Sequence, residues 1–347
     1  MQCTIYNIYI YIYYMTIIKK TVNKQGLTTY IVGKNMTDQE AEDKLLNKFV
    51  EPSMINNIIK NDADVYTEEG KLLARFRKNI LPKTHTQAFY DNVIKFALTP
   101  SSNRGSATGS NSKNVWDNPK IMTNIFGFFD RFSPSQKIII KNKGIKRPLE
   151  VRDCRFNRDF PDLYKETLPL IHDIDKLYKK YAPEHYKKQK AKARQTPFII
   201  PNTSFTTITT NVNFRTSIHT DKGDDIEGFG NLVVIENGKY KGAETCFPQY
   251  GIGVDARTGD ALFMDVHELH GNLPMIPIDK DARRLSIVCY LRNNIWKRSK
   301  GKSIKFMQKH NKSLRSTDTI AKTNAQKSKN TNNRTRKNRS RSRIMYI

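Results

Sequence analysis

The sequence predicts a mainly β protein with flanking helices, an α+β chain in which the helices come first. Between residues 203 and 292, short runs rich in Thr, Val, Ile, Phe and Tyr are separated by Gly, Asn and Asp. This pattern of short strand-like runs and turn residues is typical of an all-β barrel or sandwich. The segments 38–60 and 161–194 instead carry apolar residues at helical spacing. After Trp296 the chain becomes polar and basic.

These changes in composition and in the spacing of apolar residues divide the chain into four parts. They are a low-complexity N-terminal extension (1–35), a mostly helical flanking region (36–195), a β core (196–296) and a disordered basic tail (297–347).

The N-terminal extension opens with the run TIYNIYIYIYYMTII. Alternating Ile and Tyr is what an A/T-only DNA tract encodes, which favours Met15 or Met36 as the true start. The competing interpretation is a hydrophobic anchor. A membrane helix needs about 20 apolar residues, and this run is shorter and interrupted by tyrosines. We therefore expect no stable membrane insertion.

Within the helical region, Asp38 is placed to cap the first helix, and Pro169 is expected to kink or start a helix. In the β core, Asn237-Gly238 predicts a hairpin turn, because a type I′ turn needs positive φ at both central positions.

The charge of the chain favours a polyanionic partner. Lys and Arg number 60 against 33 Asp and Glu, a net charge of +27, and the tail holds only one acid, Asp318. Nucleic acid is the first candidate and an anionic membrane the second. The competing interpretation of the tail is a solvated segment that aids solubility. In the folded part, Arg215, Lys222 and the cluster 187–194 are candidates to hold phosphates.

The four cysteines lie far apart and form no CxxC pair, which argues against a secreted disulfide scaffold. We expect an intracellular protein, in the nucleus or cytoplasm of a host cell, or in a virion if the protein is viral. The sequence indicates no oligomeric state.

Three histidines in the β core suggest metal chemistry. His219 and Asp221, in SIHTDKGD, are two residues apart, so a strand directs both side chains to one side. His267 and His270 follow in GDALFMDVHELHGN. Two histidines and one carboxylate on one face of a metal leave positions open, which favours non-haem Fe(II) in oxygenases. A lone HxD is common by chance, so the distal histidine is what makes the pattern specific.

The next strand, RLSIVCY, places Arg284, Ser286 and Val288 on one face, with Arg283 on the other. HxD, a distal His after a Gly-Asp turn and Arg-x-Ser together resemble the 2-oxoglutarate/Fe(II)-dependent dioxygenases. The resemblance implies a double-stranded β-helix, a jelly-roll or cupin-like core of about eight strands over 203–292.

The same resemblance implies the roles of individual residues. The distal ligand of the family precedes a glycine, which selects His270 over His267. Fe(II) is then held by His219, Asp221 and His270, while Arg284 and Ser286 bind the cosubstrate 2-oxoglutarate through its distal carboxylate.

Within the superfamily, HTDKGD, GKYKGAE, PQYGIGVD and HGN look most like the TET/JBP branch. This implies hydroxylation, with O2, of the methyl group of thymine or 5-methylcytosine in DNA, releasing succinate and CO2. Two alternatives stay open. One is a dioxygenase acting on a protein side chain or RNA, and the other is a non-catalytic nucleic-acid-binding protein with a degenerate barrel. The complete set of His219, Asp221, His270 and Arg284 speaks against the second.

Overall fold

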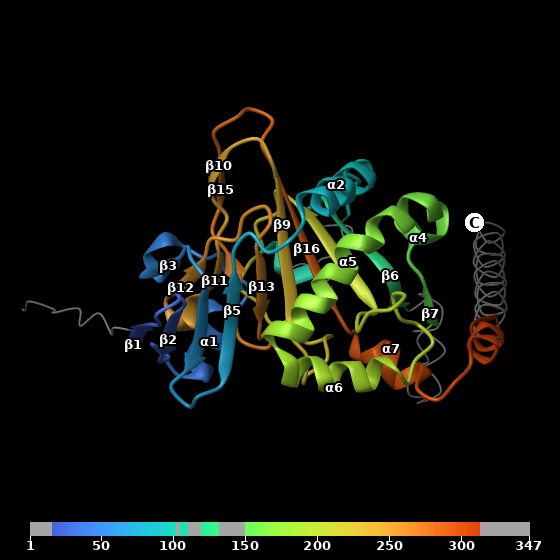
Figure 1. Cartoon of the computed structure of the whole chain (residues 1–347), viewed down its shortest axis with the longest axis horizontal. Helices are drawn as coiled ribbons and strands as arrows, with labels where there is room; N and C mark the ends of the chain where they lie inside the picture. Colours follow the sequence, from blue (N-terminus) through green and yellow to red (C-terminus); the bar gives the residue numbers. More distant parts are fainter. Residues whose placement is uncertain (1–15, 102–104, 110–118, 132–149, 313–347) are drawn as a thin grey trace, which may run out of the picture.

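Two β-sheets pack against each other in the computed structural model, which describes residues 16–101, 105–109, 119–131 and 150–312 (Figure 1). The larger sheet has the strand order β1-β2-β4-β5-β13-β9-β16-β8-β6-β7, and the smaller one β14-β11-β12-β3. A two-stranded ribbon, β10 (Tyr240–Gly242) with β15 (Met275–Pro277), projects from them.

The strands of the larger sheet are β1 (Ile17–Val22), β2 (Thr28–Val32), β4 (Ala63–Thr67), β5 (Leu72–Arg77), β6 (Thr123–Arg131), β7 (Glu150–Asp153), β8 (Thr207–Val212), β9 (Gly230–Asn237), β13 (Ala261–Met264) and β16 (Arg283–Tyr290). Those of the smaller sheet are β3 (Asn57–Ile59), β11 (Thr245–Phe247), β12 (Ile252–Val254) and β14 (Gly271–Asn272).

The centre of this arrangement is the predicted double-stranded β-helix. Strands β13, β9, β16 and β8 are neighbours in the larger sheet and run antiparallel. Facing them, β12, β11 and β14 are antiparallel neighbours, and a bridge between His219 and His270 extends that sheet by one position. The chain thus passes back and forth between two four-membered layers, as in a jelly roll. The predicted fold class, mainly β with flanking helices, is confirmed.

The regions before the core contain more β structure than predicted. Strands β1 and β2 occupy part of the supposed low-complexity extension, and β3 to β7 lie in the region 36–195 that we expected to be mostly helical. The helical prediction for 38–60 was wrong after residue 45. Several of these strands also pair with distant partners, for example Phe76 of β5 with Leu262 of β13, and local periodicity does not reveal such pairs. Their central residues are buried on both faces, which removes the alternation of a half-buried strand.

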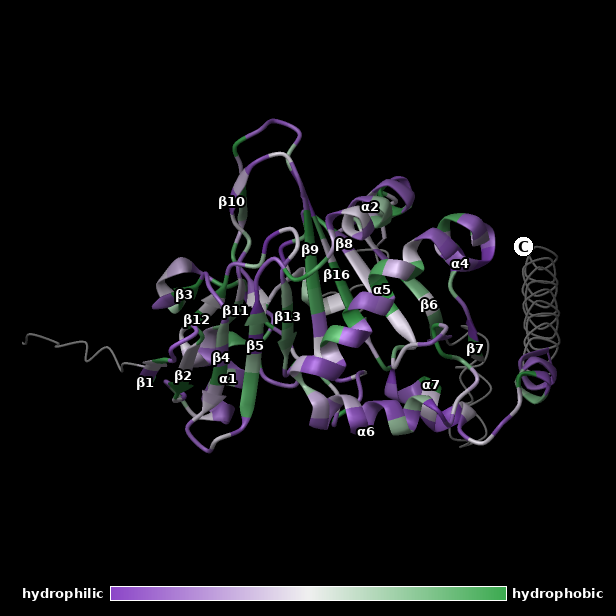
Figure 2. Cartoon of the chain, viewed as in Figure 1, coloured by the Kyte–Doolittle hydropathy of each residue, from purple (hydrophilic) through white to green (hydrophobic). Residues whose placement is uncertain are grey.

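Helices cover one face of the larger sheet (Figure 1). They are α2 (Lys83–Ala97), α4 (Arg155–Asp159), α5 (Pro161–Tyr181) and α6 (Pro183–Ala193). Helix α1 (Asp38–Leu45) instead packs with Cys246 of the smaller sheet, and α7 (Asn293–Ser299) packs with Val151 of β7. Thr37 rather than Asp38 is the N-cap of α1, and its hydroxyl and the Glu40 carboxylate form a capping box. Pro169 lies inside α5 and does not start a helix. Figure 2 shows apolar strands at the centre and polar residues on the outer sides of the helices.

The predicted boundary of the tail is also wrong. Helix α7 crosses residue 296, and the chain stays folded to residue 312. Met307 is buried with Ile295, Val151 and Phe198, so these residues have enough apolar contact to order the segment. Residues 313–347, which include the basic run RTRKNRSRSR, lie outside the described residues, as do residues 1–15. Among the described residues, no helix combines the length and apolar character needed to cross a membrane.

An aromatic stack joins α5 to the barrel and is expected to dominate its stability. Phe263 of β13 is fully buried and stacks on Tyr178 and Tyr181, with ring centroids 6.2 and 6.0 Å away. Phe263→Ala should lower the free energy of unfolding by about 3–5 kcal/mol, the cost of emptying a buried aromatic site. Urea unfolding followed by circular dichroism measures it. Phe306→Ala, at a side chain that is 53% exposed, is the matched control, and equal losses in both variants would contradict the expectation.

Candidate metal centre

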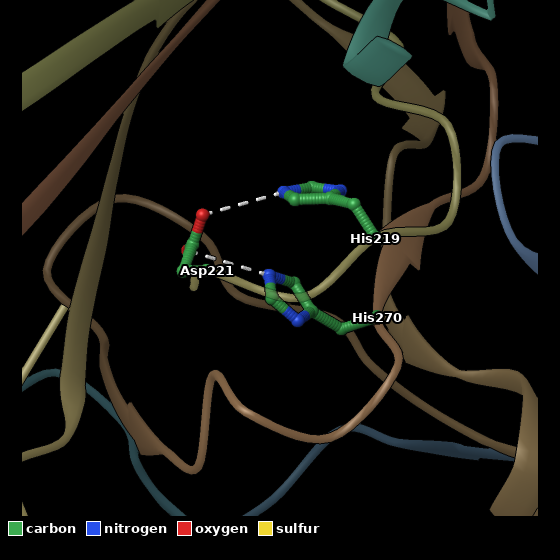
Figure 3. Close-up of side chains that lie close together, drawn as sticks. All are labelled: His219, Asp221 and His270. Carbon is green, nitrogen blue, oxygen red and sulfur yellow. Dashed lines mark ion pairs between the residues drawn. The ribbon is translucent and has the colours of Figure 1, made fainter. Parts of the chain in front are cut away.

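His219, Asp221 and His270 converge at one end of the barrel (Figure 3). The backbone N–H and C=O groups of His219 and His270 exchange two hydrogen bonds of 2.9 Å, and this isolated antiparallel bridge holds the two residues side by side. Their ring centroids are 4.5 Å apart. The Asp221 carboxylate faces both, 3.7 Å from His219 Nε2 and 3.7 Å from His270 Nε2. One ligand atom from each residue lies within 4.8 Å of the others.

Hydrogen bonds to the backbone orient both imidazoles. Nδ1 of His219 is 2.7 Å from the Ser217 carbonyl, and Nδ1 of His270 is 2.9 Å from the Glu268 carbonyl. A carbonyl can only accept, so each Nδ1 carries the proton and each Nε2 lone pair points toward Asp221. Neutral imidazoles held through the second nitrogen are typical of metal ligands. The donor set of two imidazoles and one carboxylate suits Fe(II).

Protons compete with a metal at this site. Burial alone would lower the pKa of His270, but the hydrogen bond and negative charge of Asp221 raise it overall. Because metal binding needs the neutral ring, metal affinity is expected to fall as the pH drops toward the raised pKa.

A cavity of about 70 Å³ lies beside the three residues and is lined at its far side by Arg284 and Ser286. Arg284, Ser286 and Val288 share the inner face of β16, as predicted, and all three line the cavity. Arg284 is only 6% exposed, and its Nε has no hydrogen-bond partner among the described residues. No carboxylate within 4 Å pairs with it in that part of the chain. Burial lowers the pKa of Arg284; a buried guanidinium in this position is therefore suited to an anionic ligand.

His267 lies apart from the metal cluster. Its Nε2 is 3.2 Å from the Asp225 carbonyl, so the structure brings together His270 and not His267 with His219 and Asp221. Asp225 in turn accepts a 2.5 Å hydrogen bond from Lys192 of α6. His267 and Lys192 thus anchor the loop that follows Asp221.

The candidate phosphate-binding cluster on α6 is largely engaged by the protein itself. Lys188 and Lys192 form ion pairs with Glu227, and Lys190 donates to the Thr203 carbonyl. Arg215 likewise pairs with Glu51. These cations stabilise the loop after Asp221 and the N-terminal part of the chain.

Glu268, which the sequence did not indicate as part of the site, helps to orient His270. The Glu268 carboxylate accepts a 3.1 Å hydrogen bond from Tyr250 and lies 3.7 Å from the Lys34 ammonium and 3.5 Å from that of Lys71. Lys71 also pairs with the buried Asp265 at 2.6 Å. Burial and the Glu268 carboxylate raise the pKa of Tyr250, so its hydroxyl stays a donor. The Glu268 carbonyl that orients His270 is therefore fixed by a side chain tied to three distant segments.

Removing that support should weaken metal binding. Glu268→Gln and Tyr250→Phe are each expected to reduce the affinity for Co(II), which replaces Fe(II) as a spectroscopic probe, by about tenfold. This is the lower end of the loss expected when a residue that orients a metal ligand is mutated. Visible absorption during a Co(II) titration measures it. Glu69→Gln, at an exposed carboxylate nearby, is the control. Unchanged affinity in both variants would show that Glu268 has no role in orienting His270.

Comparison with known proteins agrees with this geometry. Residues 140–293 match Tet_JBP, described as the oxygenase domain of the 2OGFeDO superfamily. The bifunctional helicase and thymine dioxygenase JBP2 of Trypanosoma cruzi (strain CL Brener) is 30% identical over 275 residues, which are 76% of this chain and 23% of that protein. The thymine dioxygenase JBP1 of Trypanosoma brucei brucei is 28% identical over 275 residues, 76% of this chain and 30% of that protein. A solved structure of NgTET1 in complex with 5mC DNA covers 82% of this chain and 90% of its own, with 15% identity and a TM-score of 0.49.

The fold and the converging residues define the class: this chain contains an oxygenase domain of the 2OGFeDO superfamily. The Tet_JBP match over residues 140–293, together with the JBP1 and JBP2 relatives, supports the predicted resemblance to the TET/JBP branch. The chain spans only about a quarter of the length of the JBP2 proteins that it matches.

Proposed function

We propose that this protein is an Fe(II)- and 2-oxoglutarate-dependent dioxygenase that hydroxylates the methyl group of thymine or 5-methylcytosine in DNA. The observation that carries the proposal is the placement of a two-histidine, one-aspartate cluster beside a cavity that ends at the buried cation Arg284. One oxygen atom of O2 is inserted into the C–H bond to give C–OH, and the other enters succinate as 2-oxoglutarate loses CO2.

In this proposal His219, Asp221 and His270 hold Fe(II), which with 2-oxoglutarate and O2 supplies the oxidant for the C–H bond. Arg284 binds the distal carboxylate of 2-oxoglutarate with its planar fork, and Ser286 adds a hydroxyl donor. The apolar side chains of Leu232, Met264 and Val288 line the same cavity and exclude water from the reacting atoms.

A second hollow, of about 130 Å³, lies on the solvent side of Asp221 and offers space for the base. It shares Asp221 and Val288 with the inner cavity, and its other lining includes Thr209, Tyr290 and Arg292. An aromatic ring and polar side chains beside the metal suit a planar pyrimidine, which must leave the DNA stack to reach it. Such a substrate implies action where DNA is found, in the nucleus or cytoplasm of a host cell or in a virion.

The test is succinate release under defined substrates. Protein reconstituted anaerobically with Fe(II) and 2-oxoglutarate is exposed to O2 with thymine-containing DNA, 5-methylcytosine DNA, RNA or a protein extract. Mass spectrometry of nucleosides from cells that express the protein then identifies the product. DNA-dependent turnover with a hydroxymethyl pyrimidine supports the proposal. Turnover that depends on RNA or protein but not on DNA would establish the alternative dioxygenase, and no turnover with bound iron would defeat both.

A further inference from the structure

One face of β16 and the residues after it line three consecutive cavities. Arg284, Ser286 and Val288 line the inner cavity beside the metal cluster. Val288, Tyr290 and Arg292 line the hollow outside Asp221, and Tyr290 and Arg292 also border a third cavity. Every second residue of a strand lies on the same face, so this series marks a path from the metal cluster to the surface of the barrel.

The third cavity is the largest of the three, at about 260 Å³, and its lining is cationic. It lies between Arg292, strands β6 and β7, and the end of α2. Three arginines, Arg152, Arg155 and Arg292, line it, and none of the described residues that line it is acidic. The remaining lining is neutral: Phe96, Ser101, Thr123, Asn124, Ile125, Phe129, Cys154 and Tyr290.

The arginines that line the cavity differ in their ion pairs with nearby carboxylates. Arg292 forms a buried ion pair with Asp130 and lies over the Phe129 ring, 4.3 Å from its centroid, so its charge is matched within the protein. Arg155 lies 3.6 Å from Asp159. That carboxylate already accepts two hydrogen bonds from Arg158, at 2.8 and 3.1 Å.

Strand geometry directs Arg152 toward the cavity. In β7 its neighbour Val151 is fully buried against Phe198 and Met307, and adjacent strand residues point to opposite faces. Arg152 pairs across the sheet with Phe129, another lining residue. Arg152 and Arg155 therefore both present a guanidinium group to the cavity.

We propose that this third cavity binds a phosphodiester group of the DNA strand next to the nucleotide whose base enters the hollow beside Asp221. The inference rests on the proposed function and adds to it a site for the backbone. The two spaces share the wall formed by Tyr290 and Arg292, so a base in one and its neighbouring phosphate in the other belong to a single extruded nucleotide. Arginine suits this role because its planar fork pairs with two phosphate oxygens at once.

The experiment combines protein and substrate changes. Binding of the full chain to a short oligonucleotide with one target base is measured by fluorescence anisotropy, without O2. In two further oligonucleotides the phosphate on either side of the target is replaced by a neutral methylphosphonate. Arg152→Gln/Arg155→Gln should weaken binding of the unmodified strand by about tenfold, the effect of one charged hydrogen-bonded contact. Neutralising one of the two phosphates should also weaken oligonucleotide binding by the wild type about tenfold. The same change should not weaken binding by the variant any further.

The control variant is Lys165→Gln/Lys179→Gln, which removes the same charge from exposed positions of α5. Equal losses on neutralising the phosphate in wild type and variant, or a variant that binds like the control, would overturn the phosphate site. Arg155→Gln alone serves if the double variant does not fold, because this guanidinium is exposed. Succinate release by the wild type with the unmodified strand tests the proposed function separately. Its absence would defeat that function even where the binding data show the phosphate contact.

Discussion

His270→Ala is expected to abolish DNA-dependent succinate release and to reduce metal affinity by more than about 100-fold. Mutation of a residue that merely orients a metal ligand already lowers the affinity by about 10–100-fold. The physical reason is that His270 supplies one of three converging ligand atoms and that its backbone pairing with His219 already fixes the ring in place. The next histidine, His267, cannot replace it, because its ring is turned toward the Asp225 carbonyl. Co(II) titration and a succinate assay measure the two effects.

His267→Ala is the matched control, a histidine three residues away that lies outside the cluster. It should retain metal binding, with at most a modest loss of activity through the loop that it anchors. If His267→Ala abolished metal binding and His270→Ala did not, the proposed ligand set would be wrong. The backbone of residue 270 would still form its bridge to His219 in either variant, so the comparison isolates the side chain.

Arg284→Gln is expected to raise the dissociation constant for 2-oxoglutarate by about 100-fold, because two charge-assisted hydrogen bonds of roughly 1.5 kcal/mol each are lost. Affinity for the metal should stay within about twofold, since Arg284 is not among the converging ligands. Calorimetry with 2-oxoglutarate and Co(II), without O2, separates the two quantities. The variant should also fold, because it exchanges a buried cation without an acidic partner among the described residues for a neutral amide.

Arg283→Gln provides the control, as the same substitution on the opposite face of β16. It should leave 2-oxoglutarate affinity unchanged. Equal affinities in wild type and Arg284→Gln would show that the cosubstrate binds elsewhere. Arg284→Lys should give an intermediate constant, since lysine keeps the charge but lacks the planar fork.

The site could be predicted from the sequence because each part of its pattern is local. The two-residue spacing of Arg284 and Ser286 follows from the period of strand β16 and needs no long-range information. His219 forms an isolated bridge with His270, and Asp221 follows it in a loop, so for this pair the short spacing in the sequence was the signal. The glycine after His270 then resolved the choice between two histidines through the resemblance. The structure places all five residues around one cavity.

The errors arose where distant pairing decides the structure. The sequence Asn237-Gly238 predicted a hairpin between neighbouring strands, and Gly238 does have a positive φ of 80°. Yet Asn237 belongs to β9 and pairs with Arg283, while β10 pairs with β15. A turn signal shows that the chain changes direction but not which strand it then meets. The contacts that hold Glu268 behind His270 could not be predicted for the same reason, since Lys34, Lys71 and Tyr250 come from three separated segments.

The strand β5 has a consequence for how this family domain can be isolated. The family match begins at residue 140, whereas β5 ends at Arg77 and covers the outer side of β13 along its whole length. A fragment limited to the matched residues would present β13 as a bare edge of buried, apolar character, which is a template for association with other chains. It would also lack the ammonium groups of Lys34 and Lys71 near Glu268. The folding unit is therefore larger than the segment that matches the family model, and the N-terminal strands belong to the same barrel as the matched residues.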